Sequence, residues 1–179
     1  MKKYTHFVFA AVVVAAMPLL MQSGSLDSEV LIFALASMGC NLLLGFTGLL
    51  SFGHAAFFGS AAYISGHMIK TYALTPEWGL LAGTVGAGLI GLVVGLVAIR
   101  RQGIYFAMIT LAIAQMVYFL CLQLPQTGGE DGLQSVPRGE LFGLISLASD
   151  TSMYYLVLAI FVGCFMAISR IVHSPFGQV

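Results

Sequence analysis

The sequence predicts an all-α protein, a polytopic transmembrane helix bundle with about six spans and a cytoplasmic N-terminus. Composition is the first observation behind this prediction. Of 179 residues, 59% are hydrophobic and only 8% are charged, whereas soluble domains have about 25% charged residues. The second observation is that several uncharged runs reach the roughly 20 residues that cross a bilayer. These runs are continuously apolar rather than alternating, which favours helices over barrel strands.

The basic residues predict the orientation. With a cytoplasmic N-terminus, the inner side receives Lys2, Lys3, Arg100, Arg101 and Arg170, and the outer side receives Lys70 and Arg138. An excess of basic residues on the cytoplasmic side is typical of membrane proteins. The net charge is zero, so composition indicates membrane lipid as the surroundings and gives no sign of nucleic acid as a partner.

The first apolar segment, Met1–Met21, allows two interpretations. Lys2 and Lys3 precede an apolar run, and Val14-Ala15-Ala16 resembles a signal-peptide cleavage site. The apolar run continues beyond that site, which favours an uncleaved first span. Either interpretation leaves the topology of the later segments unchanged.

The second span is expected from Val30 to about Leu50, with Asn41 near the middle of the membrane. A polar side chain at that depth needs a partner helix or a water-filled cavity. Asn41 therefore either bonds a neighbouring helix or contacts a transported solute.

Small residues at helical spacing mark the third and fourth spans, expected at about Gly53–Tyr72 and Trp78–Ile99. Such stripes let helix backbones approach closely in lipid. The stripe of the third span is Ser51, Ala55, Gly59, Ala62 and Gly66, and that of the fourth is Thr84, Gly88, Gly91 and Gly95. We expect both stripes to be helix-packing faces.

The fifth span is expected at about Gly103–Leu124 and the last at about Ser152–Ile171. Ala107, Thr110 and Ala114 form a small face on the fifth span, and Gln115 lies well round the helix from Thr110. A long, polar, external loop, Pro125–Asp150, separates these two spans.

No span carries an acidic or basic residue near its centre, so an ion-coupled carrier is disfavoured.

The motifs of several enzyme classes are absent from the sequence. There is no phosphate-binding loop, no His/Glu cluster at metal spacing, and no Ser/His/Asp set. Three isolated cysteines, Cys40, Cys121 and Cys164, indicate buried apolar positions rather than redox or metal chemistry. We therefore expect no enzymatic activity, metal or cofactor, and a membrane enzyme using His54 and His67 is the minority hypothesis.

Four blocks of the chain carry a family resemblance. The segment Gly45–Tyr63 resembles the signature of branched-chain amino acid ABC transporter permeases of the Liv type. Arg101–Ala112 is similar to the family's next block, Thr127–Leu133 to its extracytoplasmic loop, and Ser174–Gly177 to a later block. The four blocks occur in the family's order over most of the chain.

The resemblance implies a multi-pass permease of the bacterial inner membrane that imports leucine, isoleucine and valine by alternating access. Its implied partners are a second permease subunit, two cytoplasmic ATPase subunits that use the ATP, and a periplasmic solute-binding protein. Relatives that carry urea or short amides share these blocks, so these solutes are an alternative. A structural or assembly subunit that lines no path is a further alternative, from another class.

The resemblance also implies site residues. The predicted path or substrate-binding residues are Asn41, Gly48, Ser51, Gly53, His54, Gly103, Tyr105 and Thr110, and Gly128, Gly129 and Asp131 are predicted to shape the outer loop where the binding protein docks. Residues 1–179 would form a single transmembrane permease domain. In the family, the Ser174–Gly177 block leads into a charged segment that contacts the ATPase, so we expect this chain to end before that coupling segment.

Overall fold

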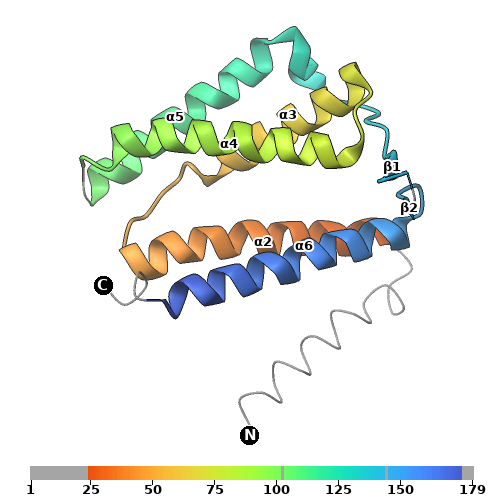
Figure 1. Cartoon of the computed structure of the whole chain (residues 1–179). Helices are drawn as coiled ribbons and strands as arrows, with labels where there is room; N and C mark the ends of the chain where they lie inside the picture. The colour runs from red at the N-terminus through yellow and green to blue at the C-terminus, as the bar shows by residue number, and fades with distance from the viewer. Residues whose placement is uncertain (1–23, 102, 144, 175–179) are drawn as a thin grey trace, which may run out of the picture. The chain divides into compact units, whose positions relative to one another are not determined.

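The computed structural model describes residues 24–101, 103–143 and 145–174, and it confirms the all-α prediction. Its long helices are α2 (Gly24–Thr47), α3 (His54–Tyr72), α4 (Pro76–Ala98), α5 (Ile104–Gln123) and α6 (Asp150–Val172) (Figure 1). The predicted first span, Met1–Met21, lies outside the described residues, as does Pro175–Gly177 of the last sequence block.

Local sequence signals explain where these helices begin and end. Pro76 starts α4, as expected for a residue without a backbone N–H. Ser149 caps α6 by accepting a hydrogen bond from the Ser152 N–H at 3.2 Å. Pro125 follows the end of α5 closely and prevents the helix from continuing. The helix α2 starts at Gly24 rather than at the predicted Val30, because its polar first turn is also helical.

Four helices in the described part are long and apolar enough to cross a membrane: α2 from Ser25, α4, α5 and α6. The helix α3 does not meet that measure, because Ser60, Ser65, His67 and Lys70 lower its hydropathy. The chain is therefore a helical membrane protein, while the number of six spans stays a prediction.

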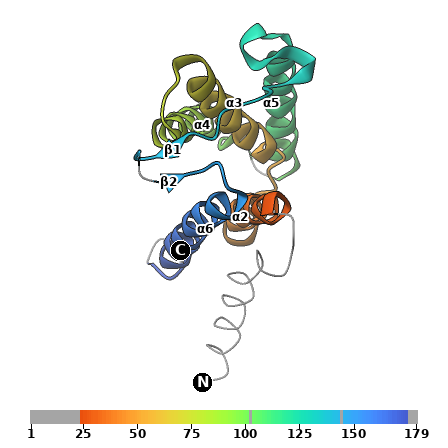
Figure 2. The ribbon, with the colours of Figure 1, turned by 90° about the vertical axis from the view of Figure 1, so that its right-hand side faces the viewer.

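The chain forms two compact units, Met1–Ser37 with Leu147–Val179, and Met38–Ser146. In the first unit, the beginning of α2 runs beside α6 (Figures 1 and 2). The second unit holds the end of α2 together with α3, α4 and α5, and α3 packs most closely against α4.

Glycines on one face of α4 allow the close approach of α3. A Cβ atom at Gly79 would come within 2.5 Å of the Ile69 side chain, and one at Gly83 would come within 2.6 Å of the Ala61 carbonyl. A Cβ atom at Gly86 would likewise come within 2.5 Å of the Ile64 side chain. At the α3–α4 contact, residues of α3 therefore pack directly against the backbone of α4, as expected for helices in lipid.

The predicted small stripes of α3 and α4 do not form this contact. Around Gly88, Gly91 and Gly95 of α4, a Cβ atom would meet nothing within 4 Å, and the same is true of Gly59 on α3. Helix α4 uses its Gly79–Gly83–Gly86 face instead. The predicted packing stripe of α4 is thus left open in the described part of the chain.

The segment between α5 and α6 is more structured than predicted. It holds two short 3-10 helices, Pro125–Thr127 and Gly129–Asp131, and a pair of short antiparallel strands, β1 (Glu140–Leu141) and β2 (Ile145–Ser146). Strand β1 lies against α4, and the Phe142 N–H donates a hydrogen bond to the Glu77 carboxylate.

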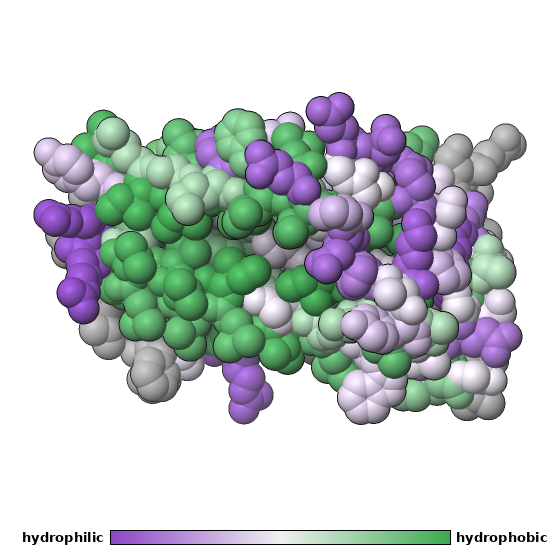
Figure 3. All heavy atoms as spheres, turned by 90° about the horizontal axis from the view of Figure 1, so that it is seen from above, coloured by the Kyte–Doolittle hydropathy of each residue, from purple (hydrophilic) through white to green (hydrophobic). Residues whose placement is uncertain are grey.

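Large apolar side chains cover much of the helix surface, including Leu96 of α4 and Met116 of α5, each 64% exposed. On the face drawn in Figure 3, hydrophobic residues form a broad continuous area. An exposed apolar area of this kind matches contact with lipid or with another membrane subunit.

Candidate functional site

The first part of the site is the turn between α2 and α3, where the first sequence block lies. Helix α2 ends at Thr47, and Gly48 follows with a left-handed φ of 65°, which favours glycine. Ser51 is buried, and its Oγ accepts a hydrogen bond from the Gly53 N–H at 3.2 Å. The turn is therefore closed by its own side chain before α3 begins at His54.

Thr110 of α5 holds this turn from the other side. Its Oγ1 accepts a hydrogen bond from the Phe52 N–H at 3.2 Å and donates one to the Ala107 carbonyl at 3.0 Å. Thr110 is only 2% exposed. Its hydroxyl is thus used in fixing the turn, and the contact joins the first and second sequence blocks.

Gly53 and His54 complete this cluster. A Cβ atom at Gly53 would lie 3.4 Å from both the Ser51 Oγ and the Thr110 Cβ, so a larger residue would press against α5. The His54 Nδ1 atom lies 3.4 Å from the Ser51 carbonyl oxygen, and its ring meets Phe57 edge-on. Ser51, Gly53, His54 and Thr110 are all predicted path residues. In the structure they hold the α2–α3 turn against α5.

A groove of about 360 Å³ runs between α3 and α5, next to this cluster. Its lining residues are Phe52, Ala55, Ala56, Gly59, Ser60 and Tyr63 on one side, and Leu111, Ala114, Gln115, Val117, Tyr118, Cys121 and Leu122 of α5 on the other. None of them is an acid, a lysine, an arginine or a histidine. Small-molecule pockets are of about 300–1,000 Å³, mostly apolar, with a few polar groups.

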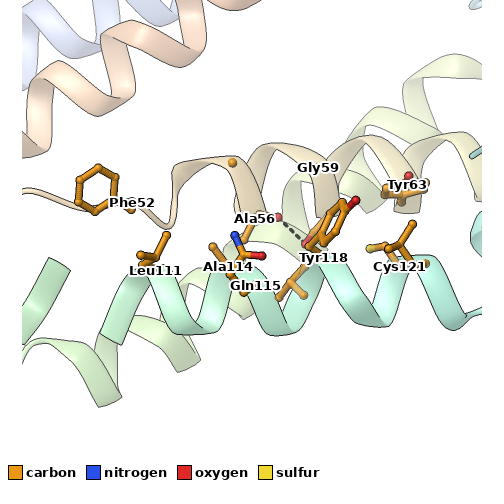
Figure 4. Close-up of a pocket in the computed structure, with 13 residues that line it drawn as sticks. Phe52, Ala56, Gly59, Tyr63, Leu111, Ala114, Gln115, Tyr118 and Cys121 are labelled. Carbon is orange, nitrogen blue, oxygen red and sulfur yellow. Dashed lines mark hydrogen bonds between the residues drawn. The ribbon is translucent and has the colours of Figure 1, made fainter. Parts of the chain in front are cut away.

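The polar groups of the groove come from both helices. Figure 4 shows Gln115 and Tyr118 on α5 and Tyr63 on α3 along the same opening. The buried Ser60 donates its hydroxyl proton to the Ala56 carbonyl at 2.6 Å, which leaves its oxygen free to accept. The groove can therefore hold an uncharged aliphatic group and hydrogen-bond a polar one.

A second hollow brings together two predicted glycines. Gly48 and Gly103 line it together with Thr47, Leu49, Ile99 and Arg101, around a volume of about 380 Å³. Gly103 also has a positive φ of 63°, so a side chain there would be strained. The hollow joins the α2–α3 turn to the α4–α5 turn within the second unit.

The outer loop is tied to the end of α3. The Lys70 Nζ donates a hydrogen bond to the Gln134 carbonyl at 2.8 Å, and the His67 Nδ1 lies 3.2 Å from the Gln126 carbonyl oxygen. Leu133 fits against Gly66, where a Cβ atom would lie 3.1 Å from its methyl group. These contacts place the loop over the part of α3 that continues the groove.

The predicted outer-loop residues shape its backbone. Gly128 and Gly129 have positive φ angles of 82° and 62°, and a Cβ atom at Gly128 would overlap the Gly132 carbonyl. The Asp131 side chain is exposed, and its carbonyl accepts from the Gln134 amide at 2.9 Å. The glycines are thus required by the turns, and docking of a binding protein here stays a prediction.

The predicted site residues therefore fall into three groups. Ser51, Gly53, His54 and Thr110 meet in the turn cluster, and Gly48 and Gly103 meet at the second hollow. Asn41 and Tyr105 are exposed residues of α2 and α5 that do not line this hollow. The predicted site residues do not include Gln115, Tyr118, Tyr63 and Gly59, which line the groove. The spacing of Leu111, Ala114, Tyr118 and Cys121 along one helical stripe was the available signal.

Comparisons with known proteins point to one family. A family described as "Branched-chain amino acid transport system / permease component" matches residues 25–179. The "High-affinity branched-chain amino acid transport system permease protein LivM" of Salmonella typhimurium is 33% identical over 148 residues, 79% of this chain and 34% of the relative. The protein of the same description from Escherichia coli is 28% identical over 207 residues, 98% of this chain and 48% of the relative.

The chain thus spans between a third and a half of the length of these relatives. No solved structure matches the chain.

Proposed function

Because this chain belongs to the family of branched-chain amino acid transport system permease components, we propose that it forms part of the permease of an ABC importer in a bacterial inner membrane. Its solutes would be leucine, isoleucine and valine. Its partners would be a second permease subunit, two cytoplasmic ATPase subunits and a periplasmic solute-binding protein, and ATP binding to the ATPases would drive alternating access.

The α3–α5 groove is the observation that carries this proposal. Its walls are mostly apolar, its polar groups are neutral, and it lies between the helices of the first two sequence blocks. An aliphatic amino acid side chain suits such walls, because each buried CH₂ group contributes about 0.8 kcal/mol. Urea and short amides, the alternative solutes, have little apolar surface to place there.

The chemistry of the groove also supports an external energy source. A proton-coupled carrier usually has an ionisable side chain along its path, and the lining of this groove has no acidic, basic or histidine residue. His54 and His67 both contact backbone carbonyl oxygens. Separate ATPase subunits would therefore supply the energy.

A second candidate function is that of an assembly subunit that packs against a permease without lining the path. The open glycines of α4, Gly88, Gly91 and Gly95, favour it, since they form a face that another membrane helix could approach closely. The two functions differ in what they predict for the groove: the assembly role does not require it.

Uptake by the whole transporter tests the proposal. The complete importer containing this chain is reconstituted in liposomes with ATP enclosed and the binding protein outside. We expect uptake of radiolabelled L-leucine that requires ATP and the binding protein and is inhibited by L-isoleucine and L-valine. Leucine uptake driven by a proton gradient alone, or no uptake of any branched-chain amino acid, would contradict the proposal.

A further inference from the structure

Gly59 lacks a side chain for no packing reason that the described residues provide. It lies within α3, and a Cβ atom added to it would meet nothing within 4 Å. Gly66, Gly79 and Gly83, by contrast, each have a neighbour that a Cβ atom would touch or overlap. Glycine in a helix interior costs about 0.5–1 kcal/mol relative to alanine. Gly88, Gly91 and Gly95 of α4 are equally open, but of these four glycines Gly59 is the one that lines the groove.

Gln115 is the second unexplained residue of the groove. It lies near the middle of α5, a helix apolar enough to cross a membrane. Its side-chain amide makes no hydrogen bond to the residues drawn in Figure 4, where it borders the groove. Gln115 is exposed in the described part of the chain, so in a membrane its amide faces lipid, a partner helix or a solute. An amide left without a hydrogen-bond partner in an apolar medium costs about 2–7 kcal/mol.

We propose that the α3–α5 groove is a solute-binding subsite in which Gly59 provides the room for a branched aliphatic side chain and Gln115 hydrogen-bonds the polar part of the same amino acid. This inference rests on the proposed function and assigns the substrate class to particular residues. Phe52, Ala55 and Leu111 supply apolar walls, and the Tyr118 hydroxyl supplies a second hydrogen-bonding group one turn after Gln115.

Charge supports this occupant over a charged one. Lysine, arginine, aspartate or glutamate would bring a side-chain charge into a groove that holds no opposite charge to pair with it, and burying an unpaired charge is costly. A neutral aliphatic side chain adds no charge beyond the α-ammonium and α-carboxylate groups that every amino acid carries. The competing occupant is an apolar side chain from a partner subunit, which the experiments below distinguish.

Cys121 gives a reporter inside the groove that does not depend on transport. It lines the groove and is partly exposed, whereas Cys40 and Cys164 are elsewhere. With Cys40→Ala and Cys164→Ala in the complete transporter, N-ethylmaleimide can label only Cys121 of this chain. We expect saturating L-leucine to slow this labelling severalfold, and L-lysine at the same concentration to leave it unchanged.

Two valine substitutions test the role of Gly59. Gly59→Val fills the groove, whereas Gly88→Val on α4 is the matched control, because both positions are helical and free of neighbours within 4 Å. One methylene group in an apolar pocket changes specificity by roughly 10–200-fold. We expect Gly59→Val to raise the KM for L-leucine about tenfold or more and the KM for L-alanine less, with Gly88→Val close to wild type for both.

Gln115 is tested by Gln115→Leu, with Gln115→Asn as the conservative variant. Loss of a hydrogen bond of this kind weakens binding by about tenfold. We expect Gln115→Leu to lose leucine protection of Cys121 and to raise KM, and Gln115→Asn to retain part of both. Thermal unfolding of each variant shows whether the fold is intact.

The outcomes separate this inference from the proposed function. ATP-dependent leucine uptake with no protection of Cys121 and normal KM values for Gly59→Val and Gln115→Leu would overturn the subsite while leaving the permease function standing. If Cys121 is inaccessible to N-ethylmaleimide with or without leucine, a partner subunit fills the groove and the subsite is overturned. If the wild-type transporter carries no branched-chain amino acid, the proposed function itself fails.

Discussion

The Thr110 hydroxyl receives a hydrogen bond from the Phe52 N–H at 3.2 Å, across 58 positions of the sequence. This contact fixes the turn before α3 against the first half of α5. The groove begins at the same point, because Phe52 and Leu111 both line it. The Thr110 hydroxyl, which is outside the lining, therefore helps to hold one end of the groove.

Replacing Thr110 with valine should loosen the turn. Valine has nearly the same shape but cannot accept from the part-buried Phe52 N–H, and the net loss of a hydrogen bond costs about 0.5–1.5 kcal/mol. We expect the melting temperature of Thr110→Val in detergent to fall, and Thr110→Ser to retain most of the stability. Thr84→Val is the control, because the Thr84 hydroxyl bonds only the Leu80 carbonyl of its own helix. An equal fall in the melting temperature of Thr84→Val would show that the hydrogen bond from the Phe52 N–H does not account for the loss of stability.

The two faces of α4 should respond differently to alanine. Gly83→Ala would press against the Ser65 side chain and the Ala61 carbonyl of α3, and overpacking of this kind costs about 1–3 kcal/mol. Gly91→Ala meets no neighbour and should be neutral, or stabilising by up to about 1 kcal/mol through helix propensity. Fluorescence-monitored thermal unfolding of both variants compares them, and a destabilised Gly91→Ala with a normal Gly83→Ala would contradict the α3–α4 packing.

The outer loop should be released when its tie to α3 is cut. Lys70→Met removes the donor to the Gln134 carbonyl while keeping an unbranched side chain. We expect faster hydrogen exchange and faster proteolysis between Pro125 and Gly139, because fewer contacts hold the loop backbone. Lys70→Arg, which keeps a charged donor, serves as the control. Unchanged protection in Lys70→Met would show that the contact of Leu133 with Gly66 is sufficient to hold the loop.

The buried carboxyl group of Asp27 should be replaceable with a gain in stability. Asp27 is 1% exposed, neither of its oxygens has a hydrogen-bond partner in the described part of the chain, and it acts electrostatically on Tyr154 of α6. A buried unpaired polar group costs about 1–3 kcal/mol, more than the roughly 0.3–1 kcal/mol that an acidic residue contributes at a helix N-terminus. Asp27→Leu should therefore raise the melting temperature.

Glu29→Leu is the matched control for that substitution. Glu29 lies two positions further along the same helix and is exposed, so its replacement removes no buried carboxyl group. We expect little change in its melting temperature. A lower melting temperature for Asp27→Leu would mean that the carboxyl group stabilises α2 more than its burial costs.

Most helix boundaries could be predicted because local residues set them. Helices α3, α4, α5 and α6 begin and end within about two residues of the expected bounds, which are Gly53–Tyr72, Trp78–Ile99, Gly103–Leu124 and Ser152–Ile171. Hydropathy alone predicts too late a beginning for α2, because the polar turn around Asp27 is also helical. An acidic residue near a helix N-terminus is favourable there, and hydropathy does not record that.

The candidate site was predictable only where residues are close in sequence or share a motif. Ser51, Gly53 and His54 lie in one block, and the resemblance connected that block with Thr110. The groove residues Gly59 and Gln115 were missed, because each helix carries small or polar residues on more than one face. Which face of α3 meets α4 is decided by the fit of Ile64 and Ile69 against glycines of α4, and the pattern within either helix alone does not show this fit.

The contact between Phe52 and Thr110 also has a consequence for biogenesis. The ribosome makes the turn before α3 well ahead of α5, because Phe52 precedes Thr110 by 58 positions. When the turn is first made, the Phe52 N–H has no Thr110 hydroxyl to bond, and water at the membrane surface can accept its hydrogen bond. We expect the turn to take its final form only after α5 has been synthesised.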